Sequence, residues 1–237
     1  MTRGKIPWQS AKEGGYPITQ WEIEGDATAL LLIDLQEANL DPKVGAGPSL
    51  WAEFPDIAGY YYDRLEESVL PTVLELQAFA RLHHLPVIYT ASGLALPDGR
   101  DVAPWSWRAS RRRPGSGIPC LLPPGAPGRG LWADLNPRPD ELLLEKQTLS
   151  PFNGTPLEQV LRNMGIENLI IGGLLTNAAV ETTARDAGDR GFNAMVIEEA
   201  CAALTAEEHE ATVGSASWYV VKTKSEVVDQ LGPLLAH

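Results

Sequence analysis

The feature that most constrains this chain is an alternation of short, mostly apolar runs with longer segments of helical spacing. The apolar runs have the length and composition of strands buried on both faces of a parallel sheet. They cover residues 28–33, 86–90, 141–146, 168–172, 192–197 and 218–221. Helices are predicted over residues 60–85, 155–165, 178–190, 205–217 and 225–235. This order predicts an α/β fold: a three-layer, doubly wound (Rossmann-like), mostly parallel six-stranded sheet with helices on both faces.

The 237 residues show no internal repeat and no interdomain linker, so we expect a single domain over residues 1–237. Residues 1–26 precede the first strand and form an N-terminal extension. Residues 92–140 are rich in Pro, Gly and Arg and are too long for an ordinary connection in a compact domain. We expect this segment to be a long loop over the functional site.

Charge and hydropathy exclude several classes of protein. The net charge of −12 makes the chain a poor partner for nucleic acid or for an anionic membrane surface. The longest apolar run has only the length of a strand, so no membrane span is predicted. Residues 1–15 lack the apolar core of a signal peptide. We therefore expect a cytoplasmic protein with neither a nucleic-acid nor a membrane partner.

The cysteines and histidines argue against a metal or a disulfide scaffold. Cys120 and Cys201 are the two cysteines, and no C-x-x-C pair exists. The four histidines show none of the spacings typical of zinc ligands. We expect no metal and no cofactor.

Polar residues follow three of the predicted strands. Asp34 ends the first, Lys146 ends the third, and residues 174–179 follow the fourth. Taken singly, Asp34 is compatible with a turn cap, Lys146 with a solvated strand end, and Thr176 with a helix cap. Sites in this fold class lie at the carboxyl ends of the strands, so together the three positions predict one site.

Several motifs in the same order resemble a known family. The matching stretches are residues 31–36, 145–146, 150–155, 172–187, 190–192 and 209–211. With them, the chain resembles the isochorismatase-like cysteine hydrolases over about residues 27–232. That superfamily includes nicotinamidases, N-carbamoylsarcosine amidohydrolases, biuret hydrolases and ureidoacrylate amidohydrolases.

The resemblance implies a Cys-Asp-Lys triad, with Asp34 as general base and Lys146 as its charged partner. The family's nucleophilic cysteine stands at position 179, where a helix N-terminus favours a thiolate. By the same resemblance, the backbone amides of Leu175 and Ala179 form the oxyanion hole. A cis peptide is expected at Leu174–Leu175.

The sequence departs from this pattern at the nucleophile, because position 179 is alanine. Two explanations stay open. Either the chain is an inactive Cys→Ala variant made to trap substrate, or it is a natural relative without the cysteine. True isochorismatases lack that cysteine and cleave a vinyl ether by acid chemistry. The residues flanking Ala179 match the cysteine amidases and favour the first explanation, and neither Cys120 nor Cys201 is placed to substitute.

Five further residues are candidates for substrate contact. Gln36 either hydrogen-bonds a substrate amide or is a loop glutamine, and Asn39 stands where relatives often have an aromatic residue. Phe152 either forms a pocket wall or packs in the core. Trp105 and Arg108 are weaker candidates, for stacking and for bidentate binding of a carboxylate or urea; a solvated basic loop is the alternative.

The leading hypothesis is an amidohydrolase that cleaves a C–N bond of a linear amide, carbamoyl or ureido small molecule. The alternatives are an isochorismatase-type enol-ether hydrolase and a non-catalytic binding protein on the same fold. Since members of the family are usually dimers or tetramers, we expect a homodimer or homotetramer.

Overall fold

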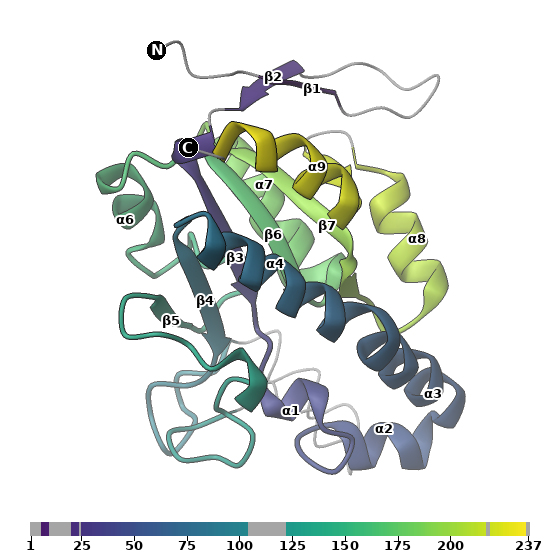
Figure 1. Cartoon of the computed structure of the whole chain (residues 1–237). Coiled ribbons are helices and arrows are strands. Elements are labelled where there is room, and N and C mark those ends of the chain that lie inside the picture. The colour runs from purple at the N-terminus through teal and green to yellow at the C-terminus, as the bar shows by residue number, and fades with distance from the viewer. Residues whose placement is uncertain (1–5, 10–19, 24, 104–121, 217–218, 236–237) are drawn as a thin grey trace.

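The computed structural model describes residues 6–9, 20–23, 25–103, 122–216 and 219–235. Its main sheet has six parallel strands in the order β5-β4-β3-β6-β7-β8 (Figure 1). The strands are β3 (Thr28–Ile33), β4 (Val87–Ser92), β5 (Leu142–Lys146), β6 (Asn168–Leu174), β7 (Asn193–Ala202) and β8 (Val220–Lys222). The order starts in the middle and extends to both edges, which confirms the doubly wound α/β fold.

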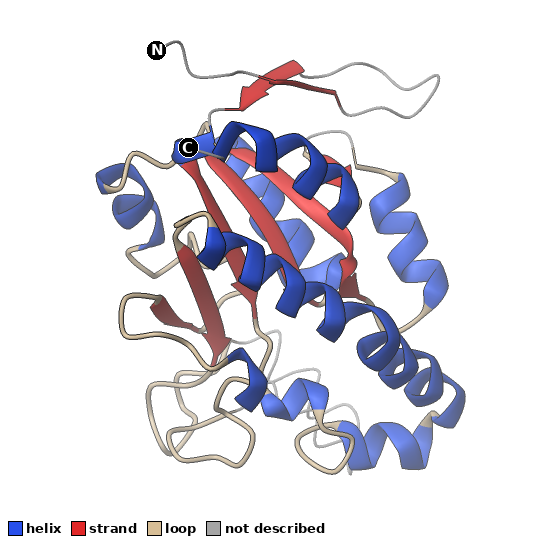
Figure 2. Cartoon of the chain, in the orientation of Figure 1, coloured by secondary structure: helices blue, strands red, loops and turns tan. Residues whose placement is uncertain are grey.

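Helices lie in front of and behind the sheet (Figure 2), as predicted. They are α1 (Glu37–Leu40), α2 (Gly47–Glu53), α3 (Pro55–Arg64), α4 (Leu70–Leu82), α6 (Leu157–Asn163), α7 (Glu181–Asp189), α8 (Ala206–Gly214) and α9 (Lys224–Leu235). Within the described ranges, no helix is long and apolar enough to cross a membrane.

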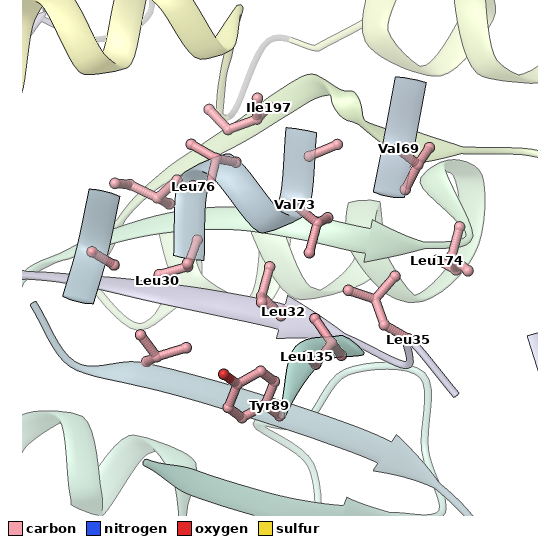
Figure 3. Packing of buried hydrophobic residues seen from close by; sticks show 14 of the residues in the cluster. Leu30, Leu32, Leu35, Val69, Val73, Leu76, Tyr89, Leu135, Leu174 and Ile197 are labelled. Atoms are coloured by element: carbon pink, nitrogen blue, oxygen red, sulfur yellow. The ribbon is translucent and has the colours of Figure 1, made fainter. Parts of the chain in front are cut away.

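Strand β3 lies at the centre of the sheet, and all six of its residues are buried. Leu30 and Leu32 point to one face, where they join a core with Val73 and Leu76 of α4 (Figure 3). Ala29, Leu31 and Ile33 point to the other face, where they pack against residues of α6 and α7. Because successive side chains of a strand alternate between faces, one apolar run supplies both cores.

The long predicted helix over residues 60–85 is longer and less regular than expected. Helix α3 begins at Pro55, a π-helical turn (Leu65–Val69) follows, and α4 carries Pro71 in its first turn. Pro71 closely follows the π-helical turn, in a helical run that continues from α3 without a break. The backbone N–H of Leu70 donates to the Leu65 carbonyl oxygen, five residues earlier, so the wider π-helical turn precedes the residue that has no N–H of its own. The short helices α1 and α2 were not predicted from the sequence.

The N-terminal extension contains β1 (Ile6–Gln9) and β2 (Gln20–Ile23), which pair antiparallel in a sheet of their own. The described parts of the long loop, residues 92–103 and 122–140, include a 3-10 turn at Ala133–Leu135. Six residues of these parts line the cavity described next.

Candidate active site

Asp34 follows the last residue of β3 and is held by the neighbouring strand β4. Its backbone has a φ of 52°, in the left-handed region that aspartate tolerates better than most residues. Its Oδ1 accepts a 2.8 Å hydrogen bond from Thr90 Oγ1, and its Oδ2 accepts one of 2.6 Å from Ser92 Oγ. These hydrogen bonds fix the carboxylate in place. Asp34 is also buried, with 6% of its surface exposed.

Lys146 ends β5 and reaches the same carboxylate. Its Nζ lies 2.5 Å from Asp34 Oδ2, 3.0 Å from Ser92 Oγ and 3.0 Å from the Thr148 carbonyl oxygen. An ammonium group has three hydrogens, so these contacts use all of them. The structure thus brings together the two charged residues that the strand-end argument placed in one site.

Thr90 and Ser92 of β4 are functional neighbours that the sequence argument missed. They stand two positions apart, so both side chains point to the same face of the strand. The parallel register aligns Ile33 with Thr90, which places both hydroxyls beside Asp34. In the sequence, the pattern that could have identified them is a pair of hydroxyl residues at alternate positions at the end of a buried strand.

The third part of the site follows β6. The Leu174–Leu175 peptide is cis, as the resemblance implied. A π-helical turn (Thr176–Val180) comes next, and the backbone N–H groups of Ala178 and Val180 donate to the Leu175 carbonyl oxygen. Ala179 is 3% exposed and lines the same cavity as Asp34 and Lys146.

A buried histidine anchors the start of this π-helical turn. His209 of α8 lies 2.9 Å from Thr176 Oγ1 through Nδ1, and 2.7 Å from Arg64 Nη2 through Nε2. Arg64 can only donate, so Nε2 accepts and the ring proton lies on Nδ1, which donates to Thr176. Burial and the neighbouring Arg64 charge lower the pKa of His209 to about 4, so the ring is neutral. Arg64 also donates to the carbonyl oxygens of Glu198 and Cys201 in β7.

The three strand-end groups open into a cavity of about 590 Å³. Its walls come from the segment containing α2 and α3, the described parts of the long loop, residues 146–149, the turn after β6, and the start of α8. This volume falls within the roughly 300–1,000 Å³ of small-molecule sites.

The candidate substrate contacts divide into several groups. Asn39 lines the cavity, and its Nδ2 donates to the Asp34 carbonyl oxygen. Gln36 also lines the cavity but is 0% exposed, and both of its amide hydrogens bond backbone carbonyls, of Ser92 and Arg129. Its Oε1 accepts from the Ser92 backbone N–H. Gln36 therefore holds loops together, the loop role left open by the sequence.

Phe152 does not line the cavity. It packs in the core beneath the sheet, 5.6 Å from the ring of Phe192. In this structure its position is the one that the core-packing alternative describes. Trp105 and Arg108 lie outside the described residues.

Cys201, the cysteine that lies among the described residues, is not placed to act as a nucleophile. Cys201 is completely buried in β7, and burial raises the pKa of its thiol to about 12. A thiol with that pKa is protonated at neutral pH and is a poor nucleophile. Cys120 lies outside the described residues.

A metal site is not found among the described residues, where no group of three or more His, Cys, Asp or Glu side chains is arranged to hold an ion. The absence of a metal and of a cofactor stays a prediction. The described groups of the site are a buried carboxylate–ammonium pair and the start of the helical segment after β6, at one cavity.

Comparison with known proteins places this geometry in context. A model of the isochorismatase domain matches residues 28–225. An uncharacterized isochorismatase family protein, YecD, of Escherichia coli O157:H7 is 30% identical over 196 residues, which cover 81% of this chain and 88% of that protein. The ureidoacrylate amidohydrolase RutB of Methylorubrum extorquens is 31% identical over 188 residues, which cover 75% of this chain and 71% of that protein.

A solved structure supports the fold. The crystal structure of a cysteine hydrolase from Pseudomonas syringae pv. phaseolicola superposes with a TM-score of 0.74 at 22% identity. The match covers 92% of this chain and 98% of that one.

Proposed function

Since the chain belongs to the isochorismatase family of hydrolases, we propose that its site is built to cleave a C–N bond of a linear amide, carbamoyl or ureido small molecule. One observation carries this proposal: the buried Asp34–Lys146 pair and position 179 line one cavity. The ureidoacrylate amidohydrolase relative supports the same kind of chemistry.

The proposed reaction needs a cysteine at position 179. Asp34 takes the thiol proton, the sulfur attacks the substrate carbonyl carbon, and the carbonyl π electrons move to the oxygen. The backbone amides of Leu175 and Ala179 hold this oxyanion. When the intermediate collapses, the C–N bond breaks and Asp34 returns the proton to the leaving nitrogen. Water activated by Asp34 then hydrolyses the thioester, which frees the acid and the thiol.

Lys146 has a supporting role in this scheme. Its ammonium lies 2.5 Å from the Asp34 carboxylate and compensates the negative charge that burial would otherwise make costly. The hydrogen bonds from Thr90 and Ser92 fix the carboxylate, so that one oxygen edge can face position 179. Asn39 is proposed to help hold the substrate, as are Trp105 by stacking and Arg108 by hydrogen bonds to a urea or amide group.

With alanine at position 179, the chain as it stands is proposed to bind such a substrate without cleaving it. The methyl group of Ala179 supplies neither a nucleophile nor a hydrogen bond, and the buried Cys201 does not replace it. This accounts for an intact base and an intact charge partner in a site without a nucleophile. We further propose that the protein works in the cytoplasm as a homodimer or homotetramer.

A second candidate function follows from the same alanine. An enol-ether hydrolase of the isochorismatase type needs an acid but no cysteine, and Asp34 is the residue that would donate the proton. In that case the unaltered chain consumes isochorismate, and Ala179→Cys brings no amidase activity.

The test is ammonia release by the Ala179→Cys variant across a panel of amides and ureides, beside the unaltered chain. We expect turnover only in the variant. A folded variant that releases no ammonia from any member of the panel overturns the proposal. Loss of isochorismate in the unaltered chain would favour the second function. Ligand binding without activity in either form would favour a binding protein.

A further inference from the structure

We infer that the site accepts uncharged amides or ureides that carry a sizeable apolar group, and that it discriminates against substrates bearing a carboxylate. This inference rests on the proposed function, because it names the substrate class of the same site. Three features of the cavity carry it: its apolar walls, the sign of its exposed charges, and the full use of its one described cation.

Apolar side chains face the cavity from three separate parts of the chain. The first part supplies Leu50 of α2, Ile57 of α3 and Phe54, which lies between these helices. The long loop supplies Leu94 and Leu122, and the segment after β5 supplies Leu149. Phe54 and Leu149 are each 37% exposed, so apolar surface remains open to a ligand. An apolar group of the substrate would remove this surface from water, which stabilises the complex.

The size of the cavity points the same way. Asp34, Lys146 and Ser92 bond one another at the strand ends, where the amide or ureide group is proposed to react. An amide or ureide group is small beside a volume of about 590 Å³. The remaining space is bounded largely by the apolar walls, so a substrate that fills it carries apolar bulk on the acyl side or the amine side.

Among the described lining residues, the exposed charged side chains are negative. Glu53 at the end of α2 and Glu208 in the first turn of α8 both line the cavity and are exposed. Neither forms a salt bridge with any described residue. Two carboxylates at the cavity, neither of them paired with a described residue, repel a substrate carboxylate in a protein whose net charge is −12.

The described lining holds one cation, Lys146, and it is fully engaged. Its three hydrogens bond Asp34, Ser92 and the Thr148 carbonyl, and its side chain is 1% exposed. Gln36 likewise has both amide hydrogens bonded to backbone. A substrate carboxylate in this part of the site would lose its hydration without gaining a charged partner, which is costly.

Binding to the unaltered chain tests this without requiring turnover. Isothermal calorimetry compares two probes that share an amide and a carbon skeleton, 4-phenylbutanamide and 4-(4-carboxyphenyl)butanamide. We expect the neutral probe to bind at least about tenfold more tightly, a difference of about 1.4 kcal/mol. Equal or tighter binding of the carboxylate probe overturns the inference, as does the absence of binding by both.

Two charge reversals identify the cause of the discrimination. Glu208→Lys should reduce the ratio of the two probes' dissociation constants at least threefold, because a positive side chain at position 208 attracts the probe carboxylate instead of repelling it. Glu167→Lys is the matched control. It changes the net charge equally but lies just before β6, at the opposite end of the sheet from the cavity. An equal change in both variants contradicts a local role for Glu208 and with it the inference.

The outcomes remain separate from those of the proposed function. If the neutral probe binds selectively but Ala179→Cys hydrolyses no amide, the proposed function fails and the binding inference stands. If Ala179→Cys hydrolyses amides but the carboxylate probe binds better, the inference fails and the proposed function stands.

Discussion

The Nζ of Lys146 lies 2.5 Å from Oδ2 of Asp34 inside the protein, where the two side chains are 1% and 8% exposed. The pair joins the ends of β5 and β3, which are separated in the sheet by β4. Removing one member leaves the other charged and buried without its partner, which typically costs about 3–5 kcal/mol. The pair therefore has consequences for stability that can be measured apart from activity.

Lys146→Met should lower the free energy of unfolding by about 3–5 kcal/mol, because it strands the buried Asp34 carboxylate. Urea denaturation measures this change. The double variant Lys146→Met with Asp34→Asn removes both charges and should recover a substantial part of the loss. A double variant as unstable as the sum of the two single variants would contradict the pairing.

Ser92→Ala should cost about 1–3 kcal/mol, since it removes one donor to Asp34 and one acceptor of Lys146. Ser225→Ala at the exposed start of α9 is the control and should change stability little. In an Ala179→Cys background, Ser92→Ala should also slow turnover because the carboxylate is less firmly oriented. Equal stability and equal turnover would show that Ser92 has no part in the site.

Cys201 should be inert in the folded protein. With a pKa of about 12, about one thiol in ten thousand is ionised at pH 8, and the side chain is completely buried. In a Cys120→Ser background, a thiol reagent should label Cys201 only after unfolding in guanidinium. Adding Ala179→Cys to that background should produce one thiol that reacts in the folded state. Fast labelling of Cys201 in the folded chain would contradict its placement.

His209 should make stability depend on pH in a defined window. Its pKa is about 4 in the folded protein and about 6.5 when exposed, so between these values the unfolded chain binds a proton that the folded chain does not. The free energy of unfolding should therefore fall as the pH drops from 6.5 towards 4. At lower pH, Glu141 reduces the free energy of unfolding further. Burial alone would raise the pKa of its carboxyl, but hydrogen bonds from Arg81, from the Arg138 backbone N–H and from Tyr89 outweigh burial and lower it to about 2.

The control for this prediction is His209→Gln, whose amide can donate to Thr176 and accept from Arg64 without titrating. Urea denaturation at a series of pH values gives the free energy of unfolding as a function of pH. In the variant, the slope of this curve between pH 4 and pH 6.5 should correspond to up to one proton fewer. An unchanged slope would show that His209 does not titrate between the two states.

The sheet could be predicted from the sequence because its strands are nearly continuous apolar runs, as β3 illustrates with six buried residues. The site could be predicted because the fold class itself brings the carboxyl ends of β3, β5 and β6 together. The helices α1 and α2 could not be predicted, since they are short and lie among glycines and prolines that resemble loop residues.

The finer contacts depend on register and packing, which the sequence does not display. Thr90 and Ser92 become partners of Asp34 only because β4 aligns with β3 at a particular register. Gln36 looks like a substrate ligand until its neighbours are known, when both amide hydrogens prove to bond backbone carbonyls. Phe152 could face a pocket or a core, and contact with Phe192 decides between them.

The most direct test of the central claim compares ammonia release by three forms of the chain on one neutral amide: unaltered, Ala179→Cys, and Ala179→Cys with Asp34→Asn. Far-UV circular dichroism checks that all three are folded. Our account predicts saturable turnover in the Ala179→Cys form alone, because the nucleophile needs Asp34 to take its proton. Equal rates in the unaltered chain and in Ala179→Cys, or turnover that survives Asp34→Asn unchanged, would contradict it.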